Sequence, residues 1–90
     1  MRQKKIRSLK MSYAIQQTIF RTCQNYYALS ESERSKIRRL CNDVVHGDKD
    51  DYKALFAVLT TQKSIRFIAY ENYMSERKLY KLRKAFYESW

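Results

Sequence analysis

The segment SIRFIAYENYMSERKLYKLRKAFYESW, residues 64–90, decides the fold that this sequence predicts. Its first part has apolar residues at the spacing of a short helix: Ile65, Ile68 and Ala69. Ser75 is a typical N-cap residue, because its hydroxyl oxygen can accept a hydrogen bond from the first turn of a helix. Apolar residues then recur on one helical face, at Leu79, Leu82, Phe86 and Trp90. The segment therefore predicts two helices joined by a tight turn.

The second of these helices has two different faces. On a helical wheel at about 100° per residue, Leu79, Phe86 and Trp90 cluster on one side. The opposite side is polar and mostly basic, and it carries Arg77, Lys81, Lys84 and Glu88, flanked by Lys78 and Tyr80. This division predicts a helix that packs on its own domain and offers the other side to a polyanion.

Two features of the turn favour a helix-turn-helix. In this motif a small residue near the end of the first helix lets the second helix cross closely, at about 90–120°. Ala69 can fill that place, and Met74 can provide the apolar side chain of the turn. Leu79 and Leu82 would then hold the second helix in position. We expect residues 62–90 to form a helix-turn-helix.

The same residues resemble the core pattern of helix-turn-helix regulators. The pattern is carried by Ile68-Ala69, Met74-Ser75, Arg77, Leu79-Tyr80 and Leu82. It is most similar to the sigma-region-4-like C-terminal domains of small phage late-gene activators of the RinA and ArpU type. The resemblance implies a regulator of phage or mobile-element type, with RNA polymerase as a partner. The family turn usually has a glycine where this chain has Tyr73, so we expect Asn72 to adopt the left-handed conformation instead.

Length and composition limit the rest of the fold. Ninety residues are enough for one domain with a single small core. The chain has no proline and one glycine, whereas average usage is about 5% and 7%. This composition favours long helices and few sharp turns. We therefore expect residues 1–90 to form one all-α bundle of about five helices.

Positive charge is concentrated at the two ends of the chain. The formal net charge of +10 indicates nucleic acid or an acidic surface as the partner. Residues 1–10 carry five basic and no acidic residues, residues 11–61 seven against six, and residues 62–90 seven against three. We predict that residues 1–10 are a basic arm that contacts phosphates through Arg2, Lys4 and Lys5. A solvated terminus without such contacts is the alternative.

Residues 11–61 are expected to be a helical support for the C-terminal motif. A first helix is predicted from Ile6 or Met11 to Tyr27. Its inward stripe follows a seven-residue spacing and consists of Ile6, Tyr13, Phe20 and Tyr27, with Leu9, Gln16 and Cys23 between them and Ile15, Ile19 and Tyr26 beside them. Burial against the other helices is the preferred interpretation, and pairing of two chains through this helix is the alternative.

The next two helices are marked by their ends. Ser30 and Glu33 have the spacing of a capping box and predict the start of a second helix. Gly47 is expected to end it in the left-handed conformation, next to His46 in the last turn. Asp48 predicts the N-cap of a third helix, which should end at Thr60-Thr61.

The residues that catalysis or metal binding would need are not grouped in this sequence. There is no glycine-rich phosphate loop, and the one histidine has no Cys or His at metal-ligand spacing. We predict no enzyme activity, no cofactor and no metal. Cys23 and Cys41 are interpreted as small buried apolar residues, with a disulfide as the alternative. No apolar run approaches the ~18 residues of a membrane span, which favours a cytoplasmic protein without a membrane partner.

These patterns predict a sequence-specific binder of double-stranded DNA. The predicted base contacts are Arg77, Lys78 and Lys81, because Arg and Lys suit the guanine acceptors of the major groove. Contacts to the DNA backbone from the motif are predicted for Lys63, Arg66, Ser75, Tyr80 and Lys84, and Tyr87 is a further predicted phosphate or base-edge contact. A homodimer on DNA is expected. The alternatives are a module that docks an acidic protein and a non-specific nucleic-acid binder.

Overall fold

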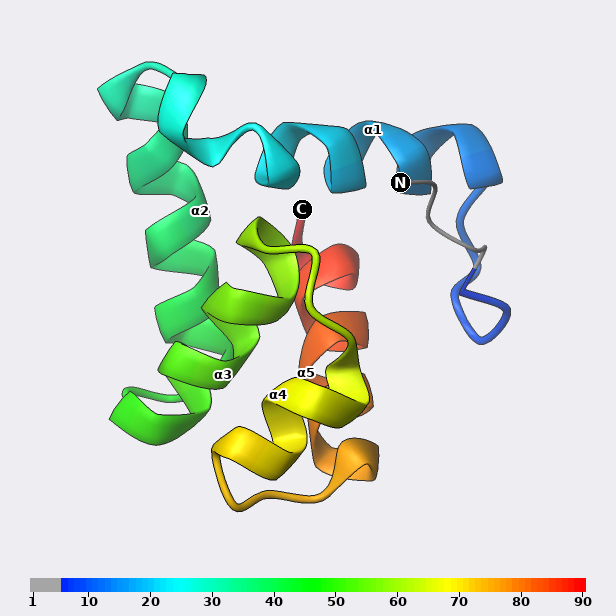
Figure 1. Cartoon of the computed structure of the whole chain (residues 1–90). Coiled ribbons are helices and arrows are strands. Elements are labelled where there is room, and N and C mark those ends of the chain that lie inside the picture. Colours follow the sequence, from blue (N-terminus) through cyan, green and yellow to red (C-terminus); the bar gives the residue numbers. More distant parts are fainter. Residues whose placement is uncertain (1–5) are drawn as a thin grey trace.

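The computed structural model describes residues 6–90, which form five α-helices, one short 3-10 helix and no strand (Figure 1). The α-helices are α1 (Tyr13–Gln24), α2 (Glu31–Val44), α3 (Lys49–Thr60), α4 (Ile65–Glu71) and α5 (Glu76–Ser89). The 3-10 helix η1 (Tyr26–Ala28) follows α1 directly. The predicted all-α fold is confirmed.

Helix α3 contacts all four of the other α-helices, and α5 packs against α2, α3 and α4. In Figure 1, α1 lies across one end of the molecule, and α4 lies at the opposite end beside the start of α5. Three neighbours therefore hold one side of α5. Its other side, which includes Arg77, Tyr80 and Lys81, is exposed.

Every α-helix begins with a side chain that accepts a hydrogen bond from the backbone of its first turn. These N-cap residues are Ser12, Ser30, Asp48, Ser64 and Ser75. The predicted capping box is present, because Ser30 and Glu33 each bond to the backbone of the other. In a chain without proline, these caps mark where one helix stops and the next starts.

The larger of two apolar clusters lies among α1, α2, α3 and α5. Its most deeply buried members are Ile19, Cys23, Ile37, Cys41, Leu55 and Phe86. Both cysteines are free. Burial raises the pKa of each thiol to about 12, because a thiolate would lose its hydration. They pack as small apolar side chains, as predicted.

The predicted start of the first helix is wrong, and its predicted inward face is confirmed only in part. Helix α1 begins at Tyr13, and residues 6–12 are not helical. The buried residues of this region come from the intermediate positions Leu9, Gln16 and Cys23 together with Ile19 and Tyr26. Three residues assigned to the stripe are exposed instead, namely Tyr13, Ile15 and Tyr27. A seven-residue spacing marks one face only within a continuous α-helix. Here residues 6–12 are not helical and residues 26–28 form a 3-10 helix, so the spacing does not define one face.

The end of α2 also differs from the prediction. His46, with φ +53°, is the first left-handed residue, and Gly47 follows with φ +81°. The His46 amide donates to the carbonyl of Asp43 and the Gly47 amide to that of Asn42. This pair of bonds is a Schellman motif, which satisfies carbonyls that the helix end leaves open. His46 therefore takes the position that Gly47 was expected to take, while Gly47 lies one residue further along.

Two general features concern the described residues as a whole. None of the helices within residues 6–90 combines the length and the apolar composition needed to cross a membrane. In the same part of the chain, no group of three or more His, Cys, Asp or Glu side chains is arranged to hold a metal ion.

Candidate nucleic-acid interface

A second apolar cluster fixes α4 and α5 relative to α3. Its buried residues are Ala54, Ile65, Ile68, Ala69 and Leu79, and the half-buried side chains of Met74 and Leu82 pack against it. Ala69 is 2% exposed, and its small side chain belongs to the contact between the two helices, as the sequence predicts. Leu82 packs against both clusters and so joins this end of α5 to the main core.

The turn between α4 and α5 is a second Schellman motif. The Tyr73 amide donates to the carbonyl of Tyr70 at 3.3 Å, and the Met74 amide donates to that of Ala69 at 3.0 Å. Tyr73 is the left-handed residue, with φ +54°, whereas Asn72 has φ −105°. The expectation that Asn72 would take this conformation is therefore wrong. Its side-chain amide instead donates to the carbonyl of Ile68, which keeps Asn72 at the end of the helix.

The exposed side of α5 forms one wall of a groove of about 700 Å³. The lining residues from this helix are Glu76, Arg77, Tyr80, Lys81, Arg83 and Lys84. Ile6 and Ser8, from the segment before α1, line it as well. The groove thus collects two predicted base contacts, Arg77 and Lys81, and two predicted backbone contacts, Tyr80 and Lys84.

Most of these groove cations have no acidic partner. Within residues 6–90, no carboxylate lies at ion-pair distance from Arg77, Lys81, Arg83 or Lys84. The one acid of the groove lining, Glu76, has its carboxylate 4.0 Å from the Nε atom of Arg66. The groove therefore has an excess of positive charge that the described chain does not neutralise.

Three other predicted contact residues lie outside the groove and are paired. The Nζ atom of Lys78 lies 3.0 Å from the carboxylate of Asp51 on α3. The Nζ atom of Lys63 lies 3.4 Å from the carboxylate of Glu71 and 5.4 Å from the centre of the Phe67 ring. Arg66 faces Glu76, as described above. Lys78 and Lys63 are therefore paired on the surface and do not line the groove.

The remaining predicted contacts have different positions. Ser75 caps α5, and its hydroxyl oxygen accepts a hydrogen bond from the Lys78 amide at 3.1 Å. Arg2, Lys4 and Lys5 lie outside the described residues. The prediction that Tyr87 contacts phosphates or base edges is wrong, because Tyr87 is 2% exposed and belongs to the main core.

The sequence pattern did not identify Arg83 as part of the site. Arg83 follows Tyr80 by three residues, so the two side chains are neighbours on the helix, and the guanidinium carbon lies 5.3 Å from the Tyr80 ring centre. Its Nε atom is buried without a hydrogen-bond partner in the described chain. Burial lowers the pKa of Arg83, although Tyr87 and Tyr80 act in the opposite direction. In the sequence, the three-residue spacing of Tyr80 and Arg83 was the one feature that could have indicated that Arg83 lies beside Tyr80.

No protein-family model matches the chain, and the comparisons with curated proteins and with solved structures gave no match either. The resemblance of the C-terminal segment to phage-type regulators therefore stays a prediction based on the motif residues alone.

Proposed function

We propose that the protein binds double-stranded DNA in a sequence-specific way, with α4 and α5 acting as a helix-turn-helix. The observation that carries this proposal is the set of unpaired cations on the exposed side of α5. Arg77 and Lys81 are one helical turn apart, so both can face the same partner. An exposed basic helix face supplies both parts of DNA binding, attraction to phosphates and hydrogen bonds to base edges.

In this proposal the residues have separate roles. Arg77 and Lys81 donate to guanine acceptors in the major groove. Lys84 and Tyr80 contact phosphates, as do Arg66 and Ser75 near the start of the helix. Lys78 and Lys63 contribute to the binding of phosphates or bases only after leaving their ion pairs with Asp51 and Glu71. The basic arm, with Arg2, Lys4 and Lys5, adds sequence-independent affinity.

The regulatory part of the proposal rests on the resemblance of the motif. A regulator of this kind acts in the cytoplasm and contacts RNA polymerase near a promoter. One recognition helix covers a short site, so two copies are expected on DNA, with half-sites about 10 bp apart or a multiple of that.

The test is selection of bound fragments from random duplex DNA, followed by binding to the recovered sequence at several salt concentrations. A specific binder yields one motif and keeps its preference over competitor DNA as salt rises. Equal loss of affinity for all duplexes identifies a non-specific nucleic-acid binder. Absence of duplex binding at ~150 mM salt, the physiological ionic strength, leaves docking of an acidic protein as the function of α5.

A further inference from the structure

The segment that precedes α1 is held in place by one buried side chain. Gln16 is 0% exposed and is the one buried polar side chain among the described residues. Its amide oxygen accepts a hydrogen bond from the Ile6 amide at 2.7 Å. Its amide nitrogen donates to the carbonyls of Ile6 and Met11, both at 3.2 Å. Three bonds from one residue therefore close residues 6–11 into a loop against α1.

This held segment is the second wall of the basic groove. Ile6 and Ser8 lie across from the residues of α5, so the groove is bounded on two sides. Arg7 and Lys10, in the same segment, are exposed. If this segment were not held in place, the groove between it and α5 would have no defined width. The three Gln16 hydrogen bonds supply that constraint.

Arg83 lies between the groove and the interior of the protein. Besides the groove, it lines a small internal cavity together with Phe20, Cys23, Val58, Leu59 and Tyr87. Its Nε donor is buried and unpaired within residues 6–90, and its charge faces no carboxylate there. Burying a charged donor without an acceptor is costly. An anion in the groove offsets part of the cost of burying the charge by attracting the guanidinium, whereas the Nε atom itself has no exposed surface.

We propose that this groove is a phosphate-binding site for one phosphodiester group of a nucleic-acid backbone. Arg83 and Lys84 supply the charge, and Gln16 is a positioning residue that keeps the opposite wall in place. The inference rests on the proposed function and adds a defined site to it. A phosphodiester carries one negative charge on oxygens that accept hydrogen bonds, which matches an arginine donor in a groove with unpaired cations.

The first test compares Arg83→Met with Arg34→Met. Both variants lose one positive charge, but Arg34 lies on α2 and pairs with Glu31. A plot of log Kobs against log salt has a negative slope. Its magnitude should decrease by about 0.9 for Arg83→Met, on the selected site and on random duplex alike. Base preference should not change. Arg34→Met should keep the original slope, and Arg83→Lys should keep most of it because the charge remains.

The second test compares Gln16→Met with Gln24→Met. Gln24 also belongs to α1 and also donates two hydrogen bonds to backbone carbonyls, but these belong to Leu59 and Thr61 at the end of α3. Gln16→Met should flatten the salt slope as Arg83→Met does, and the two changes combined should add little. Gln24→Met should leave the slope unchanged. If Arg83→Met melts below the assay temperature, the comparison of Gln16→Met with Gln24→Met still tests whether the groove binds a phosphate.

The outcomes separate this inference from the proposed function. Unchanged slopes in Arg83→Met and Gln16→Met, with base preference retained, overturn the groove as a phosphate site and leave sequence-specific binding intact. A flattened slope without any preferred sequence in the unaltered protein supports the groove and overturns sequence-specific binding. Displacement of bound duplex by polyglutamate as effectively as by random DNA shows a carboxylate site and overturns the phosphodiester assignment.

Discussion

Helices α2 and α5 are closely matched in their construction and differ in what they do with their positive charge. Each is 14 residues long, begins at a serine N-cap and has glutamate in its first turn. Each also carries several lysines and arginines. On α2, three of the four basic residues have an ion-pair or cation–π partner inside the described structure, whereas on α5 two of the five have one.

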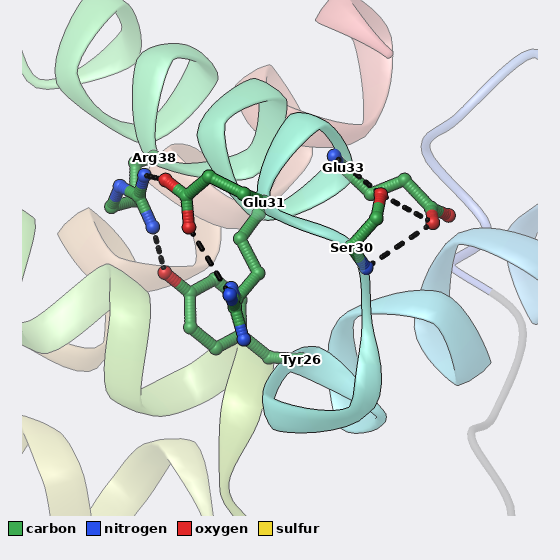
Figure 2. A network of polar contacts seen from close by, with 6 residues as sticks. Tyr26, Ser30, Glu31, Glu33 and Arg38 are labelled. Carbon is green, nitrogen blue, oxygen red and sulfur yellow. Dashed lines mark hydrogen bonds and ion pairs between the residues drawn. The ribbon is translucent and has the colours of Figure 1, made fainter.

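The partners on α2 form a compact network. Figure 2 shows Glu31 bonded to Arg38, which also donates to the hydroxyl of Tyr26 at 2.7 Å. The second arginine of this network is Arg34, which lies 3.1 Å from Glu31. The ammonium group of Lys36 lies 4.0 Å above the Trp90 ring. The basic residues of α2 thus connect it to η1 and to the end of α5.

The difference shows that charge count alone does not identify a binding surface. Where cations are paired within the fold, neighbouring carboxylates already offset part of their charge, although such exposed pairs add little to stability. On α5, Arg77, Lys81 and Lys84 are collected in one groove and remain unpaired within residues 6–90. These three cations, together with Arg83 in the same groove, are the ones that an external anion could meet.

The largest expected effect comes from the apolar side of α5. Leu79 is 0% exposed and belongs to the cluster that joins α3, α4 and α5. Leu79→Ala should lower the free energy of unfolding by about 2–5 kcal/mol, because it leaves a cavity in that cluster. Chemical denaturation measures the loss. Arg77→Ala, on the opposite side, is the control and should melt like the unaltered protein; early melting of that control would mean that α5 faces the other way.

The next effect concerns recognition by the exposed side of α5. Arg77→Ala should cost about 1–3 kcal/mol of binding free energy on the selected site and relax preference at one base position. Arg77→Lys should restore only part of the affinity, because the charge remains but the two-pronged guanidinium is lost. Lys84→Ala should weaken all duplexes without a change of preference. Titration against variants of the selected site measures all three. Full rescue by Arg77→Lys would assign Arg77 to a phosphate.

A smaller effect is expected at His46 and Tyr73, the two left-handed non-glycine residues, which follow the ends of α2 and α4. Tyr73 is 98% exposed, so its removal sacrifices no buried contact. The left-handed conformation costs a non-glycine residue roughly 1–2 kcal/mol. Glycine avoids this strain, but part of the gain is lost because glycine gives up more conformational entropy on folding. Tyr73→Gly and His46→Gly should each raise the free energy of unfolding by up to about 1 kcal/mol. A clear loss of stability in Tyr73→Gly would show that its side chain has a structural role.

The smallest effect tests the network on α2 through its pH dependence. Hydrogen bonds from Arg38 and Arg34 lower the pKa of Glu31 below its usual value. Stability from these pairs is therefore present above the pKa of the unfolded chain and is lost as pH falls through the lower folded pKa. Glu31→Gln should melt below the unaltered protein at pH 6, and the difference should shrink at more acidic pH. A difference that is constant with pH would exclude this ionisation as its cause.

Local signals in the sequence predicted much of the fold. The helix starts at Ser30, Asp48 and Ser75 depend on neighbouring residues, and the structure contains all three. The apolar face of α5 follows from helical spacing, and Leu79 and Phe86 are buried as predicted. These features form within one or two helical turns, so the sequence carries them directly.

The errors occur where distant contacts decide the structure. Gln16 was assigned to the inward stripe and is buried, but its partners, backbone groups of a non-helical segment ten and five residues away, were not predicted. Spacing cannot reveal such a contact. The left-handed conformation of Tyr73 follows from the position where α4 ends and contradicts the residue's own preference. Arg83 belongs to the groove because the segment with Ile6 and Ser8 lines the same space. A helical wheel of α5 alone cannot predict the position of that distant segment.

The most direct test of α5 as the binding face is a comparison of two double variants with the same change in net charge. One variant combines Arg77→Ala with Lys81→Ala on α5, and the other combines Arg34→Ala with Arg39→Ala on α2. Affinity for the selected duplex is measured for both at one salt concentration, together with their melting temperatures. The α5 variant should lose specific binding and melt normally, while the α2 variant should bind nearly as well as the unaltered protein. Equal losses of affinity in the two variants would show that binding follows total charge and would contradict a DNA-binding face on α5.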